Sequence, residues 1–123
     1  MSEPLKGIVI SHGSLAAAMV KTVEQISGVT GVLVPVSNTD CEPSAIEKRL
    51  TEAIGNEPAV VFVDMPSGSC FFAAMKTIRQ QELPIVTGVN LPMLVDFVFH
   101  RETSVQEAAR RAVSRGGEAI HIR

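Results

Sequence analysis

A histidine follows an apolar run near the start of this 123-residue chain. Residues Gly7 to Ser11 have the composition of a buried strand, His12 comes next, and helical periodicity begins after Gly13-Ser14. An imidazole can serve there as a nucleophile when a neighbouring group fixes its tautomer. His12 is therefore the first residue to consider for chemistry.

A second group of polar residues lies in "VDMPSGSCFFAAMK", residues 63 to 76. Asp64 closes another apolar run, and Ser67-Gly68-Ser69 form a small turn where a helix is expected to start. Backbone N–H groups at a helix N-terminus bind anions, and a serine hydroxyl adds a donor. A carboxylate that accepts from one imidazole nitrogen leaves the other nitrogen as a nucleophile. A histidine, a carboxylate and an anion site together would suit phosphoryl transfer.

Each of these residues also has a plain structural interpretation. His12 could be a capping or solvated residue at a strand end. Asp64 could be a helix N-cap, because Asp is among the preferred capping residues. The Ser-Gly-Ser composition of residues 67–69 is common in turns. A shared function therefore depends on whether the fold brings these residues together.

Apolar runs alternate with helical patterns along the whole chain. The expected strands are residues 8–10, 32–36, 59–63 and 84–88, with a short last strand in 118–123. Such alternation predicts βαβ units and a mainly parallel sheet with helices on both faces, in a single domain over residues 1–123. Pro35 cannot donate to a strand ladder, so its strand belongs on an edge.

Edge placement of the second strand favours the order 2-1-3-4, the flavodoxin-like three-layer arrangement. Ligands bind such sheets at the carboxyl ends of the strands, where the strand order switches direction. Here that point lies between the first and third strands, which end at His12 and Asp64. The fold and the chemistry therefore indicate the same place.

The expected helices have recognisable faces and ends. Residues at helical spacing predict an inward face made of Leu15, Met19, Val23 and Ile26. Ser44 and Glu47 have capping-box spacing before a stripe of Ile46, Leu50 and Ile54. A helix over about residues 69–81 is followed by another over 93–99. The last helix, residues 104–115, is expected to bury Val105, Ala108, Ala109, Ala112 and Val113 and to end at Gly116-Gly117.

Composition and charge exclude several classes of function. The chain has 11 basic and 13 acidic residues and no basic run, which argues against a nucleic-acid partner. No apolar stretch is long enough to cross a bilayer, and the acidic, polar start is not typical of a signal peptide. Cys41 and Cys70 form neither a CxxC pair nor a zinc spacing. We therefore expect free thiols and a cytoplasmic protein.

The remaining candidates for chemistry have simpler interpretations. Cys70 at a helix start could be a reactive thiol, but without a second Cys at redox spacing a packed thiol is favoured. His100 is expected to be solvated at a helix end, and His121 to face outward. Isolated histidines without short spacing do not predict a metal site, and "GSLAAAMVKT" lacks the spacing of a nucleotide P-loop. We expect no metal, nucleotide or other cofactor.

The run "GVNLPML", residues 88 to 94, also has a structural interpretation. Asn90 can cap a helix whose first turn contains Pro92. A purely structural role is favoured for these two residues. Met93 and Leu94 fit a core or a partner-facing surface equally well.

Three segments together give the chain a family resemblance. They are "IVISHGSLAAAMVKTVEQISG", the run Val63-Asp64, Gly68-Ser69, Phe71 and Ala73-Ala74, and "GVNLPML", which is the most specific. Their order and spacing along nearly the whole chain resemble the enzyme IIA domain of the mannose-type sugar phosphotransferase system. The chain departs from that family's pattern at Ser67, which replaces a Gly, at Cys70, which replaces a Pro, and at Phe72, where many members have Asn.

The resemblance implies a role for each matching residue. The histidine after the first strand is phosphorylated in that family, which implies phosphorylation of His12. The aspartate after the third strand orients it, which implies that role for Asp64. Ser69 is then expected to hold the phosphoryl group, and we add Gly68, Ser11 and nearby backbone N–H groups to this phosphoryl-binding site. The resemblance also implies a homodimer in which the last strand is exchanged.

The function expected from these residues is that of a phosphocarrier. It would accept a phosphoryl group on His12 from the phosphocarrier protein HPr and pass it to a IIB component, and it would serve membrane subunits only indirectly. Two alternatives stay open. One is the related subunit that feeds a dihydroxyacetone kinase, against which "GVNLPML" argues. The other is a regulatory module whose phosphorylation reports sugar status without driving transport.

Overall fold

The computed structural model describes residues 4–39 and 42–123. Cys41, to which the sequence assigns no role, lies outside the described residues. In chain order the elements are β1 (Lys6–Ser11), α1 (Leu15–Ser27), β2 (Leu33–Ser37), α2 (Pro43–Ile54), β3 (Ala59–Val63), α3 (Gly68–Gln81), β4 (Ile85–Thr87), α4 (Leu91–Phe99) and α5 (Val105–Glu118).

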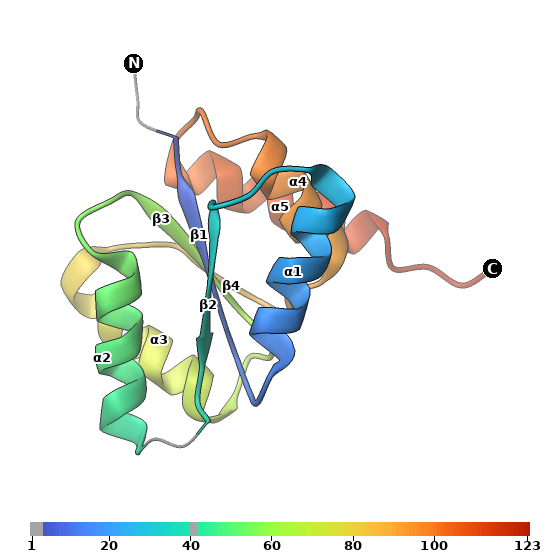
Figure 1. The fold of residues 1–123 in the computed structure, drawn as a ribbon. Coiled ribbons are helices and arrows are strands. Elements are labelled where there is room, and N and C mark those ends of the chain that lie inside the picture. The colour runs from blue at the N-terminus through green and yellow to red at the C-terminus, as the bar shows by residue number, and fades with distance from the viewer. Residues whose placement is uncertain (1–3, 40–41) are drawn as a thin grey trace.

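The strands form one parallel sheet in the order β2-β1-β3-β4, with helices on both faces (Figure 1). Helices α2 and α3 cover one face, and α1, α4 and α5 cover the other. This confirms the predicted order 2-1-3-4 and the three-layer architecture. None of the helices in the described ranges is both long and apolar enough to cross a membrane.

Two hydrophobic cores lie on opposite faces of the sheet, and the strands supply both. Along β3, Val60 and Phe62 point to the face of α1, α4 and α5, whereas Val61 and Val63 point to that of α2 and α3. This follows from the two-residue side-chain period of a strand. The Phe62 ring meets the Phe97 ring of α4 edge to face, with centroids 5.3 Å apart. A strand buried on both faces holds its carboxyl end in a fixed position.

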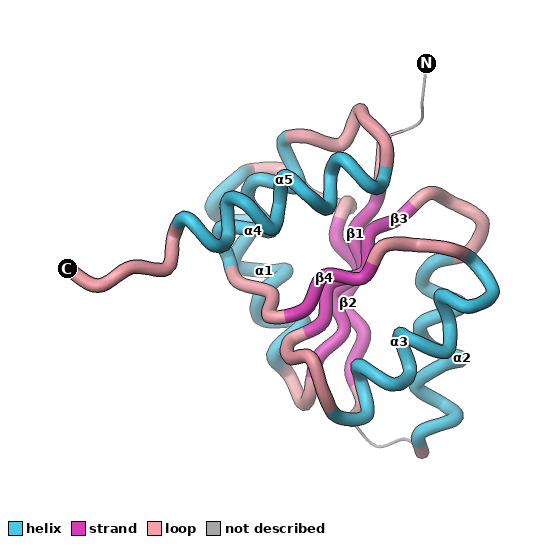
Figure 2. The backbone as a smooth tube through the Cα atoms, turned by 180° about the vertical axis from the view of Figure 1, so that it is seen from behind, coloured by secondary structure: helices cyan, strands magenta, loops and turns pink. Residues whose placement is uncertain are grey.

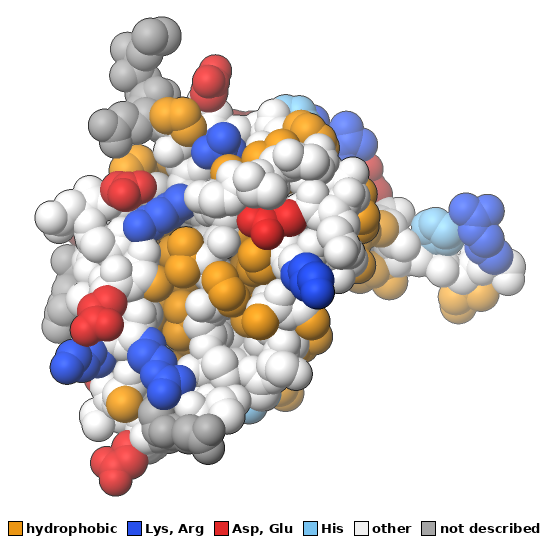
Figure 3. Space-filling model, viewed as in Figure 1, with side chains coloured by type: hydrophobic (Ala, Val, Ile, Leu, Met, Phe, Trp, Pro, Cys, Tyr) orange, Lys and Arg blue, Asp and Glu red, His pale blue; other side chains and the backbone are white. Residues whose placement is uncertain are grey.

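The edge position predicted for β2 from its proline is confirmed. Pro35 lies opposite Val9 of β1, and β2 has no second neighbour among the described strands. Figure 3 shows hydrophobic side chains gathered over β2, between α1 and α2. Pro35 itself is exposed, and a proline on an edge hinders the pairing of a further strand.

The predicted inward face of α1 is partly wrong. Leu15 and Ile26 are exposed, and the buried residues of the helix are Ala16, Val20 and Val23. The helix therefore packs smaller side chains against the sheet than the sequence pattern predicted. Large side chains dominated the sequence pattern, but a small residue such as Ala16 lets helix and sheet approach closely.

Small buried residues also explain why Val113 of α5 is not in the core. It was expected inside, yet it is exposed, while Ala108, Ala109 and Ala112 are buried. An alanine-lined face is sufficient for α5 because α4 packs closely against it. The stripe predicted for α2 is confirmed, since Ile46, Leu50 and Ile54 are all buried.

Helix starts follow the proline positions more closely than the capping box. Helix α2 begins at Pro43, with Glu42 as the N-cap and no side-chain capping bond, so the predicted Ser44 start is wrong. Proline has a φ that suits the first helical position, and it needs no hydrogen bond for its nitrogen. In α4 the prediction for Asn90 is confirmed, because its side chain accepts the N–H of Met93 at 3.1 Å.

The C-terminal segment differs most from its prediction. Helix α5 continues through Gly116-Gly117 to Glu118, and residues 119–123 form no strand within this chain. The tail extends away from the body, with Ile120 and Ile122 exposed (Figures 1 and 2). Pairing of this tail with a second copy of the chain stays a prediction.

Close packing of two helices explains why Gly116 does not end α5. A Cβ at Gly116 would collide with the Met93 side chain, and the Gly116 carbonyl accepts the Asn90 side-chain N–H at 3.1 Å. The glycine is therefore a contact point between α4 and α5. Gly117, the next residue, has no atom within 4 Å of such a Cβ.

These neighbouring glycines give a matched pair of variants. We expect Gly116→Ala to destabilise the fold by about 1–3 kcal/mol, the usual cost of overpacking. Gly117→Ala should instead be neutral or stabilise by up to about 1 kcal/mol, because alanine favours a helix. Urea unfolding of both variants measures the difference. A Gly116→Ala variant as stable as Gly117→Ala would contradict this packing.

Candidate functional site

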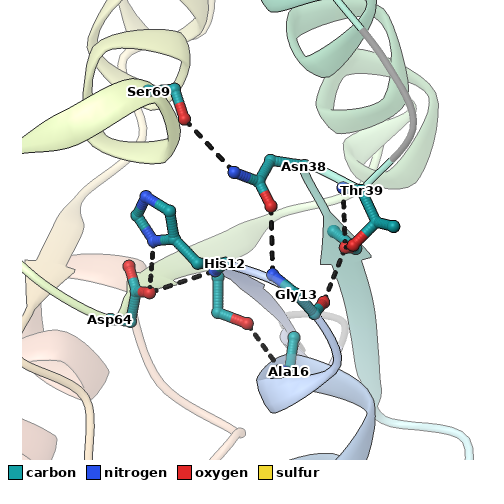
Figure 4. A network of polar contacts seen from close by, with 9 residues as sticks. His12, Gly13, Ala16, Asn38, Thr39, Asp64 and Ser69 are labelled. Carbon is teal, nitrogen blue, oxygen red and sulfur yellow. Dashed lines mark hydrogen bonds and ion pairs between the residues drawn. The ribbon is translucent and has the colours of Figure 1, made fainter.

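His12 and Asp64 meet at the carboxyl ends of two neighbouring strands. Strands β1 and β3 pair in parallel, with Ile10 opposite Val63, so the residues that follow lie side by side. The Nδ1 atom of His12 is 2.7 Å from Oδ2 of Asp64, and the backbone N–H of His12 donates to the same oxygen at 3.1 Å (Figure 4). The structure therefore brings together the two residues that the sequence placed at the switch point.

The two partners differ in exposure. The His12 side chain is 41% exposed and that of Asp64 only 12%. A carboxylate that accepts at Oδ2 requires the hydrogen of the neutral imidazole on Nδ1, which leaves a lone pair on Nε2. The site thus combines a largely buried carboxylate with an accessible imidazole nitrogen. Asp64 is not the N-cap of α3, because Ser67 occupies that position.

The free nitrogen of His12 faces the start of α3. A Cβ at Gly68 would lie 3.3 Å from Nε2, and Gly68 has φ +88°, which favours glycine. The first N–H groups of a helix have no partner within it, so they can receive an anion at this end. Gly68 therefore allows the backbone of α3 to approach the imidazole closely.

Asn38 is a residue of the site that the sequence analysis missed. Its Oδ1 accepts the N–H of Gly13 at 3.0 Å, and its Nδ2 donates to Oγ of Ser69 at 3.4 Å. Figure 4 shows this side chain between the turn that follows His12 and the start of α3. The available signal was its position directly after the strand that neighbours β1, since carboxyl ends of parallel strands share one edge.

A second set of contacts holds the loop after β2 against the His12 turn. The Ser37 hydroxyl donates to the carbonyl of Gly13 at 2.6 Å. Arg49 of α2 donates from Nη1 to the carbonyls of Ser37 and Thr39, at 2.8 and 2.9 Å. The loop that presents Asn38 is therefore hydrogen-bonded both to the turn after β1 and to α2.

Ser11 does not join this site in the structure. It is fully buried, and its Oγ accepts the N–H of Ala16 at 2.6 Å. Ser14, the N-cap of α1, makes no side-chain capping bond. Ser11 thus provides a hydrogen-bond acceptor for a backbone N–H group at the start of α1. We therefore leave it out of the proposed phosphoryl-binding site.

The other candidate residues lie elsewhere or in the core. His100 ends α4 and its Nδ1 donates to the carbonyl of Asp96 at 2.8 Å, whereas His121 lies in the exposed tail. Met93 and Leu94 are buried, which resolves their two interpretations in favour of the core. Cys70 is buried in the first turn of α3, as the packed-thiol interpretation predicts.

The surface beside His12 carries exposed apolar side chains. Phe72 is 62% exposed on α3, and Met65, next to Asp64, and Leu15, at the start of α1, are also exposed. A groove lined by Ser69, Phe72 and Lys76 of α3 and by residues of α2 opens next to the site. Exposed large apolar residues around a polar centre are typical of protein interaction surfaces.

The chain is a doubly wound α/β protein with a histidine–carboxylate pair at the switch point of its parallel sheet. The family model described as the PTS system fructose IIA component, EIIA-man, matches residues 6–114. The chain therefore belongs to this family of sugar phosphotransferase system components. The resemblance stated from the sequence is confirmed.

Individual relatives agree with this assignment. The chain is 27% identical over 121 residues to the mannose-specific EIIAB component of the phosphotransferase system of Escherichia coli strain K12. That match covers 92% of this chain and 38% of the relative, so the chain spans well under half the length of that protein.

Two solved structures share the fold. The mannose/sorbose specific IIA subunit of Enterococcus faecalis has a TM-score of 0.85 at 24% identity and covers 98% of this chain and 96% of its own. A phosphotransferase system component EIIA of Streptococcus agalactiae has a TM-score of 0.87 at 18% identity, with 96% of each chain covered. At these identities the likeness establishes the architecture.

The geometry predicts the tautomer of His12. Neutral His12 should carry its hydrogen on Nδ1, because Asp64 accepts there, whereas exposed His121 should favour hydrogen on Nε2 as free imidazoles do. Long-range ¹H–¹⁵N NMR spectra distinguish the two forms. In an Asp64→Ala variant the His12 signals should move toward those of His121. Wild-type protein with the hydrogen of His12 on Nε2 would contradict the observed contact.

Proposed function

We propose that this chain is a phosphocarrier that accepts a phosphoryl group on His12 from the phosphocarrier protein HPr and passes it to a IIB component. The observation that supports this most strongly is the orientation of His12, with Nδ1 on Asp64 and Nε2 toward the start of α3. Membership of the family supplies the setting, since its members are components of a sugar phosphotransferase system.

The proposed step needs only groups present in the two proteins. The lone pair of His12 Nε2 attacks the phosphorus of a donor phosphohistidine, and the bond between phosphorus and the donor nitrogen breaks. The donor nitrogen keeps the electron pair. Positive charge then develops on the His12 ring, and the carboxylate of Asp64 stabilises it from the Nδ1 side. Transfer to an acceptor is the same step with the roles exchanged.

The start of α3 would hold the phosphoryl oxygens. Backbone N–H groups at Gly68 and Ser69, together with the Ser69 hydroxyl, are donors suited to a transferring phosphoryl group. Asn38 would position Ser69 through its Nδ2 contact. Because phosphoryl transfer depends mainly on positioning and charge stabilisation, this arrangement needs no metal or nucleotide.

The partners would bind over the exposed side of His12. Leu15, Met65 and Phe72 offer apolar contact area around a nitrogen that must stay accessible to a second protein. Such a carrier works in the cytoplasm and reaches membrane subunits only through its acceptor. Phe72, where many family members have Asn, would alter this contact surface rather than the transfer step.

We also propose that the chain forms a homodimer through its tail. Ile120 and Ile122 have period-two spacing in an exposed segment. The outer edge of β4 has no neighbour among the described strands (Figure 2). A groove beside it is lined by Ile85, Val113 and neighbouring residues. A strand from a second copy would cover that edge.

The phosphorylation site is tested with phosphoenolpyruvate, enzyme I and HPr, followed by intact-mass measurement at alkaline pH. Wild-type protein and His121→Ala should each gain one phosphoryl group, and His12→Ala should gain none. Label that persists in His12→Ala would refute the assignment. Added IIB protein should then remove the label; a label that stays would favour the regulatory alternative.

Light scattering tests the dimer. The full chain should be dimeric at micromolar concentration, and a chain that ends at Glu118 should be monomeric. Among full-length variants, the double variant Ile120→Asp and Ile122→Asp should also be monomeric. His121→Ala should stay dimeric, because in a strand the His121 side chain would point away from the face that carries the two isoleucines. A dimer that survives removal of residues 119–123 would show that the tail does not form the interface.

A further inference from the structure

His12 lies within a cluster of three side chains that could bind a metal ion. One ligand atom each from His12, Asp64 and Cys70 lies within 4.8 Å of the other two. They come from the end of β1, the end of β3 and the first turn of α3. The sequence did not predict this cluster, because their separations of 52 and 6 residues are unlike those of zinc motifs.

Asp64 has an oxygen available for a cation. Its Oδ2 accepts both hydrogen bonds from His12, whereas Oδ1 is buried and has no hydrogen-bond partner among the described residues. A buried carboxylate oxygen without a donor is unfavourable, because it has lost its water. A bound cation would satisfy Oδ1.

The donor atoms select the metal. A thiolate, an imidazole nitrogen and one carboxylate oxygen suit Zn²⁺, whereas Mg²⁺ and Ca²⁺ prefer oxygen alone. Zinc bonds of about 2.0–2.3 Å place tetrahedral ligand atoms roughly 3.3–3.7 Å apart. The three ligand atoms lie within 4.8 Å of one another, so small side-chain adjustments, including rotation of the part-exposed His12 ring, would complete the geometry. Water or another small ligand would complete the tetrahedron.

The position of Cys70 also favours this chemistry. Its sulfur lies in the first turn of α3, where the positive end of the helix dipole stabilises a thiolate. The residue is fully buried, so a metal would enter from the exposed side of His12. On binding, the thiol would release its proton to solvent and form the zinc–sulfur bond.

We propose that His12, Asp64 and Cys70 form an inhibitory Zn²⁺ site. Zinc on His12 Nε2 removes the lone pair that would attack phosphorus, and zinc on Nδ1 displaces the Asp64 hydrogen bond that orients the ring. In either geometry, bound metal and phosphorylation of His12 exclude each other. Binding itself stands on the cluster alone; only its inhibitory effect rests on the proposed phosphocarrier function.

Cobalt(II) tests the site without reference to activity. The wild-type chain should take up one Co²⁺ and develop the intense near-ultraviolet sulfur-to-cobalt charge-transfer absorption, which Zn²⁺ then abolishes by displacement. Cys70→Ala should lose this absorption, and Cys41→Ala should keep it as the matched control. Cys70→Ser, which retains a polar side chain of similar size, guards against a packing defect.

Calorimetric titration with ZnCl₂ gives the affinity. Loss of an outer-shell partner costs about 10- to 100-fold in metal affinity, so loss of the Cys70 ligand should cost about 100-fold or more. His121→Ala should bind like wild type. Absence of the charge-transfer band in wild type, or zinc binding that survives Cys70→Ala and Cys70→Ser, would overturn the proposal.

The inhibitory effect is measured as the rate of phosphorylation from HPr, with each variant compared with its own rate without metal. Zinc at ten times its dissociation constant should slow wild type and Cys41→Ala about 10-fold, and should leave Cys70→Ala unaffected. A phosphorylation rate that is unchanged when zinc is bound would overturn the proposed inhibition. A chain that binds zinc but is never phosphorylated would contradict the phosphocarrier proposal and leave the metal site standing.

Discussion

The hydrogen bond between His12 and Asp64 is the contact on which the proposed chemistry depends. It joins residues 52 positions apart, and it forms because β1 and β3 pair in parallel with Ile10 opposite Val63. A shift of one residue in that register would turn the side chains to the opposite faces of the sheet. Both strands are buried on two faces, so the two hydrophobic cores fix the register.

This arrangement combines a rigidly held carboxylate with an accessible imidazole nitrogen. Asp64 is largely buried while the His12 ring is partly exposed, so one side of the ring is held by the protein and the other stays open to a partner. Gly68 brings the start of α3 close to Nε2 without a side chain in between. The proposed transfer of a phosphoryl group from one protein to another would need both properties.

The sequence predicted the strand order and the His12–Asp64 pair because both depend on strong local signals. Proline marked the edge strand, and apolar runs marked the ends of β1 and β3. The position of Ser11 was predicted less well, since a serine at a strand end can face either the site or the next helix. Asn38 was missed because its role arises only when three chain segments meet.

Packing also explains the other differences from the sequence prediction. The inward face of α1 depends on Ala16, whose small side chain gives little signal in a hydrophobic pattern. Gly116 was expected to end α5, yet it serves as the contact with Met93 inside the helix. The proximity of Cys70 to His12 likewise depends on how α3 is placed on the sheet, and no spacing in the sequence reports it.

The identity of the phosphorylated nitrogen tests the orientation of His12 most directly. Asp64 accepts a hydrogen bond from Nδ1, so the proposed phosphoryl group would form its bond to Nε2. NMR of ¹⁵N-labelled protein after phosphorylation distinguishes the two phosphohistidine isomers by the nitrogen that couples to phosphorus. Coupling to Nε2 of His12 is the predicted result. Phosphorus on Nδ1 would contradict it, because Asp64 could not then hold the ring as the structure has it.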